Sequence, residues 1–255
     1  KSYRTKVVFG TATSSDDASG TVIRTAALDQ PLCGSELTRQ AQRELGVIEQ
    51  IPPSVSALKR DGVRDHERVR RGETIDRPPR RVRLDGVELV EHSDAEATFI
   101  LHCGAGFYVR AWARDLGEAM ASAAHISELR RLSASGLDAR GAMTLEELEA
   151  MTLEQRQGQL ISIGTALSNL IPVMEVDEQT ALALQNGQKP VFEGEAPSGE
   201  LASAILVRRA EDQQLVCVAS LQARTMVDED GVEPDGGSQL EFKVVRGFRS
   251  DVALR

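Results

Sequence analysis

The chain has 255 residues, of which 41% are hydrophobic and 27% are charged, so it has enough apolar residues to form the core of a globular protein. No apolar run approaches the roughly 20 residues that a membrane-spanning helix needs, and the amino terminus shows no signal-peptide pattern. These features exclude a helical membrane protein. The length suits two domains or one large one.

Charge is distributed unevenly along the chain. The formal net charge is −9, which by itself argues against a nucleic-acid binder. Between Lys59 and Arg83, however, there are ten Lys or Arg residues against five Asp or Glu residues, whereas from Glu175 onward there are eight against fifteen. A compact basic segment in an acidic chain indicates a binding surface for a polyanion. A solvated, salt-bridged face is the alternative that this pattern leaves open.

Cysteines and histidines give no sign of a metal site or a disulfide framework. Cys33, Cys103 and Cys217 are far apart, and the four histidines are equally scattered. An odd number of cysteines without metal-ligand spacing fits free thiols in a reducing compartment. We therefore expect a cytoplasmic protein with no metal and no cofactor.

The first predicted elements are a strand and a short helix. The strand is expected at Thr5–Phe9, followed by a polar loop or turn over 10–20. An amphipathic helix is expected over 35–45, with Gly46 as its stop signal. Its apolar positions recur every four residues, at Leu37, Ala41 and Leu45.

Two proline pairs bound the basic segment. Pro52-Pro53 breaks the preceding pattern, and the residues over 50–83 are interpreted as an extended excursion from the core. Strands are expected again at 81–84 and 97–103. A helix follows, because apolar residues then fall on one helical face: Val109, Trp112, Ala113, Leu116 and Met120.

The end of the chain is predicted to form a second, β-rich part. Thr144 and Glu147 have the spacing of a helical capping box. Pro172 marks the expected boundary between a domain over 1–170 and a small domain over 173–255. In that small domain we expect a short helix ending at Asn186-Gly187, strands at 205–207 and 215–219, and an acidic loop over 228–237. The whole pattern predicts an α+β fold with a mixed, largely antiparallel sheet flanked by helices.

Tyr3 and Tyr108 are the two tyrosines of the chain, and each lies next to or near an arginine. A tyrosine can stack on a nucleobase and offer its hydroxyl for proton transfer or hydrogen bonding. A pair of half-buried core tyrosines is the simpler reading of these residues taken alone. The motifs around them decide between the two.

Four motifs occur in order over about the first 150 residues. They are Lys1-Ser2-Tyr3-Arg4 with the stretch to Gly20, Gln50-Ile51-Pro52-Pro53-Ser54-Val55-Ser56-Ala57-Leu58-Lys59, Gly104-Ala105-Gly106-Phe107-Tyr108-Val109-Arg110 continuing to Asp115-Leu116-Gly117, and Ala124-His125-Ile126-Ser127-Glu128-Leu129-Arg130-Arg131. Together they resemble the motifs of the bacterial TruB family of tRNA pseudouridine synthases. Past Pro172 the chain resembles only loosely the RNA-binding tails of that family, which are often PUA-like.

The resemblance implies an isomerase that converts uridine to pseudouridine at position 55, in the T-arm of tRNA, with an aspartate as nucleophile. Tyr3 is expected to stack on the flipped uracil and to take part in proton transfer, with Tyr108 against the base and Leu129 closing the pocket. Arg110 is expected to pair with the catalytic aspartate. Lys59 and Arg64, with the basic segment around them, are expected to bind the RNA backbone. The resemblance implies no cofactor, no membrane, no obligate protein partner and a monomer.

The chain departs from the family pattern at several positions. Phe107 stands where the family usually has a threonine, and Val55 replaces a common tyrosine. His66 stands where an aromatic residue is frequent, and Ser14-Ser15-Asp16 replaces the usual acidic and threonine pattern. The family's nucleophilic aspartate lies in a Gly-x-Leu-Asp-Pro motif upstream of the first tyrosine, and the 255 residues contain no such motif. Leu28-Asp29-Gln30 lacks its proline and glycine and follows Tyr3. We therefore expect an amino-terminally truncated enzyme that is inactive by itself, with Arg110 left as an unpaired cation.

Two other classes of function remain open at this point. The first is a non-catalytic RNA-binding protein or tRNA chaperone on the same fold. The second is a generic acidic α+β protein whose basic segment is only a solvated face. Salt-dependent binding of tRNA would separate the second from the RNA-binding classes.

Overall fold

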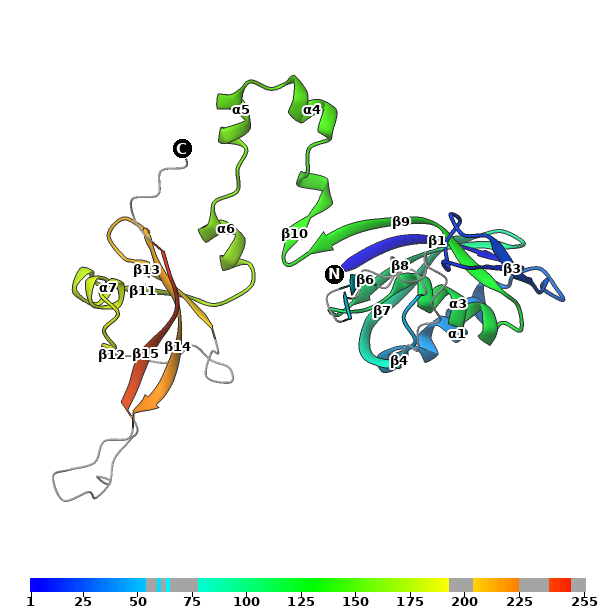
Figure 1. The fold of residues 1–255 in the computed structure, drawn as a ribbon, viewed down its shortest axis with the longest axis horizontal. Helices are drawn as coiled ribbons and strands as arrows, with labels where there is room; N and C mark the ends of the chain where they lie inside the picture. Colours follow the sequence, from blue (N-terminus) through cyan, green and yellow to red (C-terminus); the bar gives the residue numbers. More distant parts are fainter. Residues whose placement is uncertain (54–58, 61–62, 65–77, 193–203, 225–238, 249–255) are drawn as a thin grey trace, which may run out of the picture. The chain divides into compact units, whose positions relative to one another are not determined.

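The computed structural model describes residues 1–53, 59–60, 63–64, 78–192, 204–224 and 239–248 (Figure 1). The chain divides into two compact units. Unit 1 comprises Lys1–Ala134 with Asp138–Ala142, and unit 2 comprises Ser135–Leu137 with Met143–Arg255. The boundary expected at Pro172 therefore lies further along the chain than the division between these units.

Unit 1 is built on a six-stranded sheet with the order β10-β9-β1-β8-β7-β4. Its strands are β1 (Ser2–Phe9), β4 (Gly46–Gln50), β7 (Arg80–His92), β8 (Glu96–Cys103), β9 (Ala124–Ala134) and β10 (Leu137–Asp138). β1 lies between β8 and β9 and is antiparallel to both. The strands predicted near 5–9, 81–84 and 97–103 are confirmed, while β4 and β9 were not predicted as strands.

Two helices cover one face of this sheet, α1 (Gly34–Arg43) and α3 (Val109–Ala119) (Figure 1). The core of unit 1 joins both helices to the strands, and its largest fully buried members are Trp112, Phe99, Leu37, Leu84, Leu101 and Leu116. The Trp112 ring meets Phe99 edge-on at a centroid distance of 5.1 Å. The helical face predicted from Val109 to Leu116 is therefore the buried face.

Glycine at position 117 allows α3 to approach β9 closely. A Cβ atom placed there would lie 2.6 Å from the backbone nitrogen of Ala124. Such a contact would force the helix away from the strand, since real Cβ atoms do not approach backbone atoms this closely. The glycine of the Asp-Leu-Gly motif thus fixes the distance between α3 and the sheet.

Two predictions for unit 1 need correction. The loop expected over 10–20 contains strand β2 (Thr11–Thr13), which pairs with β3 (Val22–Thr25). The partner strand and the burial of Ala12 and Thr13 favour this hairpin over a loop, and a single sequence window contains neither signal. The helix expected to reach residue 45 ends at Arg43, and Leu45 is exposed. Gly46 has a φ of 97°, so the chain turns there directly into β4.

From Met143 onward, unit 2 first forms three short helices: α4 (Leu145–Ala150), α5 (Leu153–Gly158) and α6 (Ile163–Ser168). The predicted capping box at Thr144 is confirmed. The Glu147 N–H donates to the Thr144 hydroxyl at 3.2 Å, and the Thr144 N–H donates to the Glu147 carboxylate at 2.7 Å. A second capping box, at Thr152 and Gln155, was not predicted. The 3₁₀ helix η1 (Ala139–Gly141) belongs to unit 1.

The rest of unit 2 is a five-stranded sheet with the order β11-β13-β14-β15-β12. The strands are β11 (Val173–Val176), β12 (Val191–Phe192), β13 (Ile205–Arg209), β14 (Leu215–Arg224) and β15 (Gln239–Gly247), and α7 (Glu178–Gln185) accompanies them. β11 and β13 are parallel, and the other described pairs of this sheet are antiparallel. The α+β class, with a second, β-rich part toward the end of the chain, is confirmed. The acidic loop predicted over 228–237 lies outside the described residues.

In the described part of the chain, no helix combines the length and apolar character needed to cross a membrane.

Candidate active site

The first turn of α3 presents the residues of the glycine-rich motif. Gly106 has a φ of 82°, a conformation that glycine adopts readily, and it turns the chain from β8 toward the helix. Tyr108 is the N-cap residue of α3, with extended backbone and no capping hydrogen bond from its own side chain. Arg110 follows in the first turn. The helix therefore carries two of the predicted site residues within its first residues.

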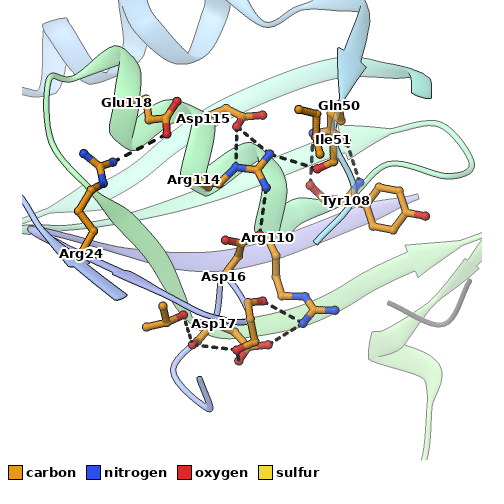
Figure 2. A network of polar contacts seen from close by, with 12 residues as sticks. Asp16, Asp17, Arg24, Gln50, Ile51, Tyr108, Arg110, Arg114, Asp115 and Glu118 are labelled. Carbon is orange, nitrogen blue, oxygen red and sulfur yellow. Dashed lines mark hydrogen bonds and ion pairs between the residues drawn. The ribbon is translucent and has the colours of Figure 1, made fainter. Parts of the chain in front are cut away.

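Arg110 reaches across to the loop that follows β2. Its Nη1 atom donates to the Asp17 carboxylate at 2.9 Å and to the carbonyl oxygen of Ser15 at 3.1 Å (Figure 2). The two charged side chains are each about a quarter exposed, 26% for Arg110 and 25% for Asp17. The expectation that Arg110 is an unpaired cation is wrong. Its partner lies 93 residues away in the sequence, and sequence spacing alone gave no reason to join them.

Asp17 is held by several donors besides Arg110. Its Oδ1 atom accepts hydrogen bonds from the Ser15 hydroxyl at 2.7 Å, the Ser19 N–H at 3.0 Å and the Ser19 hydroxyl at 2.5 Å. Burial alone would raise the pKa of Asp17, but the hydrogen bonds from Ser19 and Ser15, with the Arg110 charge, lower it below its ordinary value. Asp17 is therefore an ionised, tightly held carboxylate.

The loop that carries Asp17 is also joined to β9. Ala18 N–H donates to the Ile126 carbonyl at 2.9 Å, and Ile126 N–H donates to the Asp16 carbonyl at 3.2 Å. Asp16 has a φ of 59°, which is uncommon for a residue other than glycine. These backbone bonds keep the turn in place beside the strand that carries Leu129.

Arg114, one helical turn after Arg110, forms a second group of polar contacts. Its guanidinium donates to Asp16 at 3.2 Å, to Asp115 at 2.9 Å and to the carbonyl oxygen of Ile51 at 3.1 Å (Figure 2). Burial raises the pKa of both Asp16 and Asp115, although the Arg114 charge acts in the opposite direction. The sequence motifs do not predict this role of Arg114, because an arginine at an exposed helical spacing looks like a surface residue.

Arg110 and Leu129 line one cleft of about 470 Å³. The other described residues that line it are Asp17, Ala18, Ser19, Ile126, Ser127 and Glu128. Leu129 is 48% exposed and lines this cleft together with Arg110. The structure thus brings together two predicted site residues from α3 and β9, beside an ionised carboxylate.

Tyr3 lies on the same face of the sheet as Leu129. Thr5 is opposite Leu129 in the β1–β9 register, and Tyr3 is two residues from Thr5 on β1. Because side chains two apart on a strand share a face, and directly paired residues share it too, Tyr3 points to the side that α3 covers. It packs against the core cluster, but it is not among the described residues that line the cleft.

Tyr108 is anchored by its backbone. In Figure 2 its ring points away from the Asp16–Asp17 segment, whereas Arg110 extends toward that segment. Tyr108 is likewise not among the described lining residues of the cleft. The roles of Tyr3 and Tyr108 at a base therefore remain predictions.

The predicted RNA-binding residues lie in a small hairpin. β5 (Lys59–Arg60) and β6 (Val63–Arg64) pair antiparallel, with Lys59 opposite Arg64. The two residues therefore form one pair across the two strands of this hairpin. The remainder of the basic segment over 65–77 lies outside the described residues.

A second hollow, of about 450 Å³, lies on the other face of the same sheet. It is lined by Ser2, His102, Arg130 and Arg140 among others, and the carboxylate of Asp138 already engages Arg140 at 2.8 Å. We place the candidate site at the cleft beside Arg110, because that cleft combines a partly buried ion pair with residues from three of the four motifs.

Solved structures support the fold independently of these residues. The chain is similar to the structure of a Cbf5–Nop10–Gar1 complex, with a TM-score of 0.64 and 17% sequence identity over 98% of this chain and 66% of the matched chain. It is also similar to an H/ACA RNP bound to a substrate RNA containing 2′-deoxyuridine, with a TM-score of 0.63 and 15% identity. At these identities the likeness defines the class of fold.

Sequence comparisons then define the family. Residues 1–109 match the model described as the TruB family pseudouridylate synthase N-terminal domain, and residues 110–176 match the tRNA pseudouridylate synthase B C-terminal domain. The curated tRNA pseudouridine synthase B of Roseobacter denitrificans is 33% identical over 89% of this chain and 70% of its own length. The chain belongs to the TruB family of pseudouridylate synthases.

Other curated relatives have the same name and are longer than the matched region. The proteins of Psychrobacter cryohalolentis and Burkholderia mallei are 34% and 35% identical, each over 74% of this chain. The chain spans 52% and 62% of their respective lengths.

Proposed function

We propose that this protein isomerises uridine to pseudouridine in tRNA, at position 55 of the T-arm. The observation that carries the proposal is the cleft in which Arg110, held by Asp17, lies beside Leu129. Membership of the TruB family supplies the type of reaction, and curated relatives with the name tRNA pseudouridine synthase B supply tRNA as the substrate class.

The reaction breaks the bond between C1′ and N1 of uridine and forms a bond between C1′ and C5. C5 then loses its proton and N1 gains one, so that the product is an isomer of uridine. It needs no cofactor and no net oxidation or reduction. The uracil must first leave its stack, at a cost of a few kcal/mol. Stacking on an aromatic ring is worth about 1–3 kcal/mol per base and offsets much of this cost. We assign this stacking to Tyr3, together with proton transfer, and assign the pocket wall to Tyr108.

In this proposal the role of Arg110 is to keep a neighbouring carboxylate ionised. A guanidinium within hydrogen-bonding distance keeps a carboxylate ionised where burial would otherwise raise its pKa. Asp17 already accepts several hydrogen bonds, so its lone pairs are engaged and it is suited to holding Arg110 rather than to attacking a sugar or base. The nucleophile is assigned to the aspartate of the Gly-x-Leu-Asp-Pro motif of the family.

The 255 residues contain no Gly-x-Leu-Asp-Pro motif. We therefore propose that the 255-residue chain binds RNA and does not by itself isomerise uridine. Lys59 and Arg64 would contact phosphates, and residues 173–255 would form a PUA-like RNA-binding domain. A non-catalytic RNA-binding protein or tRNA chaperone on the same fold is the alternative that an experiment must separate from the enzyme.

One experiment separates these functions. The 255-residue chain and the full-length gene product would each be incubated with an unmodified T-arm stem-loop, and pseudouridine would be quantified by mass spectrometry after chemical derivatisation. We expect salt-dependent RNA binding by both and pseudouridine only with the full-length product. Pseudouridine formed by the 255-residue chain would overturn the assignment of the nucleophile. Binding without product in both samples would support the chaperone instead.

A further inference from the structure

Gln50, the last residue of β4, is fully buried, with 0% of its surface exposed. Both ends of its side-chain amide contact the backbone of one residue, Tyr108. Tyr108 N–H donates to Gln50 Oε1 at 3.0 Å, and Gln50 Nε2 donates to the Tyr108 carbonyl at 3.3 Å (Figure 2). The two residues are 58 positions apart in the sequence.

A primary amide is suited to this contact, because it has one acceptor and one donor side by side, as a peptide group does. The contact also satisfies a buried polar group that would otherwise cost free energy. The Tyr108 carbonyl accepts a further hydrogen bond from Trp112 N–H at 3.0 Å, which is the first hydrogen bond of α3. Gln50 therefore holds the residue at which α3 begins.

A second bond joins the same two segments. The carbonyl oxygen of Ile51 accepts a hydrogen bond from Arg114 at 3.1 Å. Gln50 and Ile51 stand where the basic segment leaves the sheet, next to Pro52-Pro53. The start of that segment is consequently tied at two points to the helix that carries Arg110.

We propose that Gln50 is a positioning residue: by fixing the Tyr108 backbone, it sets the first turn of α3 so that Arg110 reaches Asp17 and the cleft. The proposal rests on the proposed function for its kinetic consequence. Its geometric consequence, the placement of Arg110, stands independently of the reaction.

Three variants of the full-length gene product test it. Gln50→Met keeps the approximate shape of the side chain and removes both hydrogen bonds. Gln50→Glu keeps the shape and restores both hydrogen bonds only while the carboxyl is protonated, a form that burial favours. Gln42→Met makes the same change at an exposed glutamine of α1 and serves as the matched control.

For Gln50→Met we expect kcat on the T-arm stem-loop to fall by about 10- to 100-fold, with KM within about twofold of wild type, measured well below the unfolding temperature. For Gln50→Glu we expect kcat relative to wild type to recover as the pH is lowered. A residue that only stabilises the fold would lower the unfolding temperature and leave kcat of the folded enzyme within about twofold. That last result would overturn the proposal.

The Arg110 side-chain NMR signals of ¹⁵N-arginine-labelled protein give a readout that needs no catalysis. Wild type and Gln42→Met should show slowly exchanging guanidinium protons, and Gln50→Met should lose them. If the wild-type enzyme formed no pseudouridine, the proposed function would fail, while the NMR result would still decide the role of Gln50. Unchanged Arg110 signals in Gln50→Met would refute it.

Discussion

Replacing Trp112 tests how α3, and with it Arg110, is held against the sheet. Trp112 is fully buried and meets Phe99 edge-on, and its indole N–H has no acceptor among the described residues. Trp112→Ala should therefore destabilise unit 1 by about 3–5 kcal/mol through the lost burial and the cavity left behind.

Trp112→Phe should cost much less. It keeps an aromatic contact with Phe99, worth about 0.5–1.5 kcal/mol, and it removes an unsatisfied buried donor whose desolvation costs about 1–3 kcal/mol. The removal of this unsatisfied donor offsets most of the free energy lost with the smaller buried ring. The free energy of unfolding of Trp112→Phe should therefore be within about 1.5 kcal/mol of wild type.

Urea unfolding followed by circular dichroism measures these differences. Trp112 is the single tryptophan of the chain, so its fluorescence in the wild-type protein identifies the transition that belongs to unit 1. If Trp112→Phe lost as much stability as Trp112→Ala, the reasoning about the unpaired N–H would be refuted.

Three further predictions concern the ionisable groups. In the native protein a thiol reagent should modify Cys33 first, because Cys33 is exposed and a hydrogen bond with a neighbouring serine lowers its pKa. Burial raises the pKa of Cys217 to about 11, so Cys217 should react more slowly. Equal labelling rates of the two cysteines would contradict this prediction. Burial raises the pKa of Asp16 above its unfolded value of about 3.9, so its contribution to stability is complete below that pH and lost as the pH rises through the folded pKa. The unfolding temperature of Asp16→Asn relative to wild type should consequently increase between about pH 3 and pH 7, and a constant difference would argue against it. Asp17→Asn, which leaves Arg110 charged without its carboxylate, should lower kcat of the full-length enzyme by about 10- to 100-fold, and a change below about twofold would remove Asp17 from the site.

Local signals in the sequence were sufficient for several elements. The apolar face from Val109 to Leu116 predicted α3, and the Thr144–Glu147 spacing predicted a capping box that the structure contains. Gly187, with a φ of 75°, ends α7 where the Asn-Gly pair placed the stop. Each of these signals acts within one or two helical turns, so a short window of sequence contains all of the relevant physics.

A short window of sequence does not contain the signals for contacts between residues far apart in the chain. The antiparallel pairing of β1 with β9 joins residues more than a hundred positions apart, for example Thr5 with Leu129. The polar residues of β9, such as Glu128 and Arg130, mask its strand character, because consecutive residues in the middle of the strand are exposed and the usual alternation of apolar and polar residues is absent there. The contact between Gln50 and Tyr108 could not be predicted for the same reason, since the partner of Gln50 is a backbone group that the sequence does not identify.

The candidate site was predicted in part. Motif resemblance identified Arg110 and Leu129, which the structure places in one cleft. It did not identify Asp17 as the partner of Arg110, because the family pattern assigns that guanidinium to the nucleophilic aspartate. An ion pair depends on how two distant segments pack, and here that packing is set by β9 and the turn at Asp16.

We propose that Arg110 and Tyr3 serve the isomerisation of a uridine bound at the cleft. Single-turnover formation of pseudouridine in a T-arm stem-loop by the full-length gene product, compared with its Arg110→Met and Tyr3→Ala variants, tests these two roles most directly. We predict that both variants lose turnover by more than about 100-fold while their Kd for the RNA stays within about threefold. Turnover near that of the wild-type enzyme in either variant would contradict the account.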